Sequence, residues 1–135
     1  MKLLICIVLY NQKVNESNAF RELSEQNANI FPHFYLYDNS SYPNTINPTA
    51  PNLYYTHNPK NPGLSVAFNH AAKYALDNGF EWLLLSDQDT YFSVDFLQRM
   101  KQATTEYPSI SLFAPIIKLS NDTIFSPCKF ILYVL

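Results

Sequence analysis

Two aspartates separated by a single residue are the side chains of this sequence best suited to chemistry. Asp87 and Asp89 flank Gln88 and come directly after an apolar run. Carboxylates at positions i and i+2 can turn toward one ligand where a strand ends in a loop, and their hard oxygens suit Mg²⁺ or Mn²⁺. A cation held by so few protein ligands takes the others from phosphate and water, and it can neutralise a leaving diphosphate in glycosyl or phosphoryl transfer. The alternative interpretation is a solvated acidic turn, because D-x-D alone is common.

The spacing of apolar residues predicts strands and helices that alternate along the chain. Residues 3–9 are apolar without interruption, as in a strand that is covered on both faces. Further strands are expected at 34–37, 53–56, 81–85 and 110–114, and helices at 15–28, at 64–78 and from Ser93 to just before Pro108. This alternation is typical of α/β proteins with a mostly parallel sheet flanked by helices.

Polar residues follow three of the predicted strands, at Tyr10, at Asp38 and at the aspartate pair. Because the carboxyl ends of parallel strands meet at one edge of a sheet, we expect these residues to lie close together. Two plainer interpretations stay open. Asp38 and Asn39 also favour turns through bonds to nearby backbone, and Tyr10 could be a strand-end aromatic with its hydroxyl in water.

Four segments resemble, in this order, the motif series of family 2 inverting glycosyltransferases with the GT-A fold. They are residues 5–11 (ICIVLYN), 36–41 (LYDNSS), 61–64 (NPGL) with Ala67 and Asn69, and 82–89 (WLLLSDQD). The D-Q-D form is most similar to the bacterial rhamnosyltransferase branch. The resemblance implies a Rossmann-like nucleotide-sugar-binding domain at residues 3–119, followed by the truncated start of an acceptor-binding region at 120–135.

The same resemblance implies roles for the matched residues. Val8 and Tyr10 would border the pyrimidine base of the donor, and Asp38 would accept a hydrogen bond from the edge of the base. Asp87 would face the ribose or the sugar, and Asp89 would hold Mn²⁺ or Mg²⁺ on the diphosphate. The implied reaction transfers a sugar from a UDP- or dTDP-sugar to a glycan or lipid-linked acceptor in polysaccharide biosynthesis.

The general base of such an enzyme has no counterpart in this sequence. After Asp89 the carboxylates are Asp95, Glu106 and Asp122, and none matches the base motif of the family. Family members are also longer, with an acceptor-binding region after the donor-binding part. We therefore expect that a truncated chain would still bind the donor but would not bind the acceptor or turn over. The apolar end of the chain could instead pair with a second copy, and a non-catalytic remnant that binds a nucleotide sugar or dimerises is the main alternative.

Composition argues against other partners. The net charge is -2 with no basic run, which excludes an electrostatic footprint for nucleic acid. No segment approaches the roughly 20 apolar residues of a membrane-spanning helix, so any membrane contact would be peripheral. Cys6 and Cys128 lie too far apart for a metal motif, which indicates a reduced, cytoplasmic setting, free or at the inner face of the membrane. The absence of G-x-G-x-x-G argues against a dinucleotide cofactor.

The segment that ends in D-Q-D-T also resembles the signature of haloacid-dehalogenase-type phosphatases, an apolar strand followed by D-x-D-x-T. In that chemistry the first aspartate is a nucleophile on phosphate and the second a general acid. That family places the motif on its first strand, whereas several predicted elements precede it here. This interpretation is therefore the weaker one.

Overall fold

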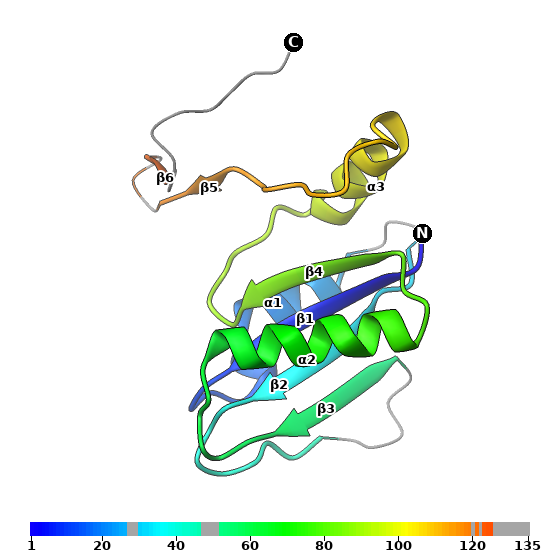
Figure 1. The fold of residues 1–135 in the computed structure, drawn as a ribbon. Coiled ribbons are helices and arrows are strands. Elements are labelled where there is room, and N and C mark those ends of the chain that lie inside the picture. The colour runs from blue at the N-terminus through cyan, green and yellow to red at the C-terminus, as the bar shows by residue number, and fades with distance from the viewer. Residues whose placement is uncertain (27–29, 47–51, 120, 122, 126–135) are drawn as a thin grey trace. The chain divides into compact units, whose positions relative to one another are not determined.

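The computed structural model describes residues 1–26, 30–46, 52–119, 121 and 123–125. The chain divides into two compact units, Met1–Ala103 and Thr104–Leu135. The first unit contains a sheet with helices on both faces, and the second contains a short antiparallel pair of strands (Figure 1). Within the described part of the chain, no helix is both long enough and apolar enough to cross a membrane.

The sheet of the first unit has four strands, β1 (Leu3–Leu9), β2 (His33–Asp38), β3 (Leu53–His57) and β4 (Trp82–Asp87). Their order is β3-β2-β1-β4, and every neighbouring pair is parallel. All seven residues of β1 are buried, because this strand has a neighbour on each side and a helical layer on each face. The predicted Rossmann-like α/β fold with a parallel sheet is confirmed (Figure 1).

Alternate residues of β1 supply the two halves of the core, since successive side chains of a strand point to opposite faces. The odd-numbered residues pack with Ala19 and Leu23 of α1 (Asn18–Ser24). The even-numbered residues, among them the fully buried Cys6, pack against α2 (Leu64–Asp77). The buried residues of α2 are three alanines four residues apart, whose small side chains let the helix approach the sheet closely: Ala67, Ala71 and Ala75.

The helix predicted at 15–28 is shorter in the structure and has a separate first turn. A 3-10 turn (Val14–Glu16) precedes α1, and α1 begins after Ser17, whose side chain accepts a hydrogen bond from the backbone of Phe20. Residues 27–29 lie outside the described residues. The helix predicted at 64–78 is confirmed, with α2 ending before Gly79 at φ +64°. The third helix, α3 (Phe96–Glu106), ends before Pro108 as predicted but starts later than expected, since Val94 and Asp95 form a turn after Ser93.

The strand predicted at 110–114 is wrong. Residues 110–116 form no regular structure, and the short strand β5 (Ile117–Lys118) pairs with β6 (Ile124–Phe125) instead. Ile110 is 44% exposed and Leu112 is 85% exposed. An apolar run becomes a strand only where a neighbouring strand pairs with its backbone, and residues 110–114 belong to neither of the two sheets in the described part of the chain.

Candidate functional site

The ends of three adjacent strands bring the predicted site residues to one edge of the sheet. In the register of the sheet, Val8 lies beside Asp87 of β4, and Leu9 lies beside Asp38 of β2. Tyr10 follows directly and is 50% exposed. The expected meeting of the three polar clusters is therefore present, and in Figure 1 the arrowheads of β2, β3 and β4 lie on the same side. The side chain of Val8 is buried in the α2 layer of the core, so its predicted contact with a base stays a prediction.

Asp87 and Asp89 are both exposed but differ in their surroundings. Asp87 ends β4, and its Oδ1 accepts hydrogen bonds from the backbone N–H of Thr90 at 3.2 Å and from the Thr90 hydroxyl at 2.5 Å. Asp89 lies in the turn that follows, and its carboxylate has no hydrogen-bond partner among the described residues. Thr90 thus orients the first aspartate, while the second is left available to a ligand.

This pair of carboxylates fits a cation that arrives with a diphosphate. In the described part of the chain, no group of three His, Cys, Asp or Glu side chains gathers to form a closed metal cage. Mg²⁺ and Mn²⁺ accept such open arrangements, in which one or two carboxylates bind together with phosphate oxygens and water. Asp89 is the better placed of the two, because Asp87 already accepts two bonds from Thr90.

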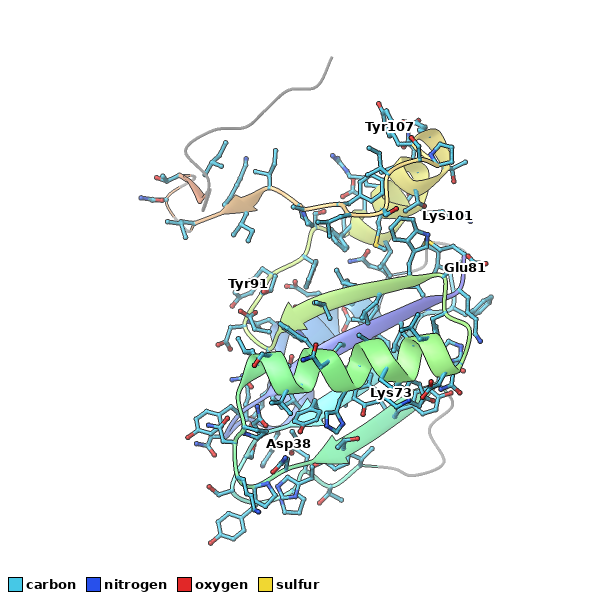
Figure 2. The ribbon with its side chains drawn as sticks, in the orientation of Figure 1. Asp38, Lys73, Glu81, Tyr91, Lys101 and Tyr107 are labelled. Atoms are coloured by element: carbon cyan, nitrogen blue, oxygen red, sulfur yellow. The ribbon has the colours of Figure 1, made fainter. Side chains whose placement is uncertain are left out.

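Asp38 forms a buried network that fixes the loop after β2. Its side chain is 0% exposed at the end of the strand (Figure 2). Oδ1 accepts a hydrogen bond from the backbone of Ser40 at 2.9 Å. Oδ2 accepts bonds from the Tyr55 hydroxyl at 2.6 Å and from the Asn44 side chain and backbone at 2.8 and 3.1 Å. The turn interpretation thus accounts for this residue, and its predicted bond to a base stays a prediction.

Ionisation of Asp38 follows from this network. Burial alone raises the pKa of the carboxyl, but the hydrogen bonds from Ser40, Tyr55 and Asn44 outweigh it and hold the pKa of Asp38 below its usual range. Burial raises the pKa of the Tyr55 hydroxyl, and the hydrogen bond to Asp38 raises this pKa further. At neutral pH the pair is therefore a carboxylate that accepts and a phenol that donates.

Three residues of this edge were not singled out from the sequence. Asn44 and Tyr55 reach Asp38 from positions that no local motif marks, because their partnership depends on how the loop folds back. His57, at the end of β3, contacts the same loop, with its Nε2 atom 2.8 Å from the carbonyl oxygen of Ser40. The Ser40 hydroxyl in turn accepts a hydrogen bond from the backbone of Asn11 at 2.8 Å, which joins this loop to the end of β1.

Ser17 connects α1 to the turn that contains the aspartates. Its buried hydroxyl accepts a bond from the Phe20 backbone at 3.2 Å and donates one to the carbonyl oxygen of Gln88 at 3.0 Å. We expect Ser17→Ala to lower the free energy of unfolding by about 1–2 kcal/mol, since a helix cap and a buried bond are lost together. Urea unfolding followed by tryptophan fluorescence measures it. Ser24→Ala, at an exposed serine of the same helix, should change stability far less, and equal losses would contradict this role for Ser17.

Comparison with protein families gives one match. The model described as glycosyl transferase family 2 matches residues 4–130. Comparisons with curated proteins and with solved structures gave no match. The family match includes all four parallel strands and the edge where Tyr10, Asp38 and the D-Q-D turn meet. The chain therefore belongs to glycosyl transferase family 2.

Proposed function

We propose that the carboxyl edge of the sheet binds a UDP- or dTDP-sugar and that Asp89 holds Mn²⁺ or Mg²⁺ on its diphosphate. A glycosyltransferase takes its sugar from a nucleotide-sugar donor and passes it to an acceptor, so the family supplies the reaction. The observation that supports the placement is the exposed Asp89 carboxylate, which has no partner in the described part of the chain and lies beside an oriented Asp87.

The residues around Asp89 suggest how the donor would lie. The half-exposed Tyr10 offers a flat aromatic surface to a pyrimidine, and Val8, two residues before it, is buried in the core. Asp87, turned by Thr90, is available to the ribose or the sugar. Asp38 supports this arrangement indirectly, because its network holds the loop that packs beside the end of β1.

In this proposal the cation acts on the leaving group of the reaction, the diphosphate. A bound Mn²⁺ or Mg²⁺ stabilises the negative charge that develops on the diphosphate when the bond to the sugar breaks. The chain's own residues bind and orient the donor for that step. Asp95 is not assigned as the general base, because its carboxylate bonds the Arg99 guanidinium at 2.6 Å on the same helix-forming segment.

The finer assignments extend the proposal. Residues 3–119 form the domain that binds the donor. The acceptor is a glycan or a lipid-linked sugar of a polysaccharide pathway. Within the family, we place the chain in the rhamnosyltransferase-like branch. The D-Q-D form of the motif supports that branch.

Calorimetric titration of UDP and dTDP, and of their hexose conjugates, tests the proposal. We expect a nucleotide to bind in the presence of Mn²⁺. After a chelator removes the metal, the affinity should fall at least about tenfold, because the diphosphate then meets two carboxylates without a cation between them. Failure of every nucleotide to bind a chain whose circular dichroism shows it to be folded would contradict the donor site. Tight binding without transfer or hydrolysis of the sugar would instead support the non-catalytic alternative.

A further inference from the structure

The middle residue of the D-Q-D turn makes two hydrogen bonds to the backbone of Tyr10, the residue that directly follows β1. The side-chain Oε1 of Gln88 accepts a bond from the N–H of Tyr10 at 2.7 Å. The side-chain Nε2 of Gln88 donates a bond to the carbonyl oxygen of Tyr10 at 3.2 Å. The last backbone pair between β1 and β4 is Val8 with Asp87, so Gln88 extends the contact between these strands beyond the ladder.

Gln88 is also held from its other side by the start of α1. Its carbonyl oxygen accepts bonds from the Ser17 hydroxyl at 3.0 Å and from the Ala19 backbone at 3.3 Å. Gln88 therefore joins β1, β4 and α1, while the aspartates on either side of it are exposed.

We propose that Gln88 is a positioning residue that fixes the distance between Tyr10 and Asp89. The inference rests on the proposed function, in which Tyr10 meets the base of the donor and Asp89 meets its diphosphate. A turn fixed before the donor arrives does not have to be ordered during binding, which strengthens the affinity. Gln88 itself touches neither part of the donor in this assignment.

The pair of bonds requires a group that both donates and accepts. An amide does so, whereas a glutamate carboxylate at the same position only accepts and would place a negative charge against the carbonyl oxygen of Tyr10. Gln88→Glu should therefore lose the bond to the carbonyl oxygen of Tyr10, and Gln88→Met, of similar size, should lose both bonds.

The first measurement needs no ligand. Amide hydrogen exchange at Tyr10, followed by NMR, should be roughly tenfold or more faster in Gln88→Met than in the unaltered protein, because the bond from Tyr10 N–H to Oε1 is lost. Gln98→Met is the matched control, since Gln98 is an exposed glutamine on α3. Unchanged protection of the Tyr10 amide in Gln88→Met would overturn the inference, whatever the protein binds.

The second measurement is the affinity for UDP with Mn²⁺. At about pH 7.5 we expect Gln88→Glu and Gln88→Met each to bind roughly tenfold more weakly than the unaltered protein. Uridine lacks the diphosphate and so does not span the distance from Tyr10 to Asp89. It should therefore bind the three proteins with nearly equal affinity, whereas a generally disordered site would lose uridine as well as UDP.

These results separate the two proposals. If the unaltered protein binds no nucleotide, the proposed function fails, while the exchange of the Tyr10 amide still tests the role of Gln88. If UDP binds with equal affinity to all three proteins, the donor site stands and the positioning role is overturned.

Discussion

Replacing Asp89 with alanine is expected to weaken the Mn²⁺-dependent binding of UDP by about 100-fold, which corresponds to about 2.7 kcal/mol. The carboxylate is exposed and has no partner among the described residues, so the change removes a ligand of the cation without disturbing an internal contact. Calorimetric titration with and without Mn²⁺ measures the loss. Binding measured without the metal should not weaken and should become somewhat tighter, because one of the two carboxylates that repel the diphosphate is gone.

Asp77→Ala is the matched control for this substitution. Asp77 is also an exposed aspartate, but it pairs with Lys73 at the end of α2 that precedes β4, at the opposite end of that strand from the aspartate turn. Both variants should unfold at nearly the same urea concentration as the unaltered protein, since exposed carboxylates contribute little to stability. An Asp89→Ala protein that binds UDP and Mn²⁺ with unaltered affinity would refute the assignment of the cation site.

Asp38→Ala is expected to lower the free energy of unfolding by about 3–5 kcal/mol, because several donors lose their acceptor together and each such loss costs about 1–3 kcal/mol. The substitution leaves the Tyr55 hydroxyl and the donors of Asn44 and Ser40 without their acceptor in a buried place. Urea unfolding at neutral pH measures the change. Tyr55→Phe removes only one of these bonds and should cost about 1–2 kcal/mol.

The contribution of Asp38 should also depend on pH. Because its pKa is lower in the folded than in the unfolded protein, its carboxylate stabilises the fold fully above the unfolded value of about 3.9. That stabilisation is lost as the pH falls through the lower, folded pKa. The difference in stability between the unaltered protein and Asp38→Ala should therefore shrink below about pH 4, and a difference that stays constant down to about pH 3 would contradict the network.

The sheet could be predicted from the sequence because its strands are marked by local patterns. The uninterrupted apolar residues of β1 match a strand with both faces covered, and the observed bounds agree with the prediction. The turn residues after β2 and β4 also indicate where those strands end. Since parallel strands end at one edge, the meeting of Tyr10, Asp38 and Asp87 follows from the alternation of elements alone.

Contacts between distant segments could not be predicted in this way. Nothing near Asn44 or Tyr55 indicates that both reach Asp38, since the loop conformation decides it. The sequence indicates Gln88 only as the spacer between two aspartates, although its side chain joins the end of β4 to the residue that follows β1. The error at residues 110–114 has the same origin, because an apolar pattern does not specify the neighbour that a strand needs.

The position of β1 in the sheet has a consequence for how the protein forms. β1 leaves the ribosome before the other strands of its sheet, yet it lies between β2 and β4, and Leu3 pairs with Trp82, far along the chain. Parallel strands so far apart in the sequence pair only after a large loop has closed, and the entropy cost of that closure comes before the favourable contacts form. Folding is therefore slow compared with that of folds built from local contacts. The uninterrupted apolar strand β1 thus stays incompletely covered until β4 has emerged, and until then the nascent chain is exposed to aggregation.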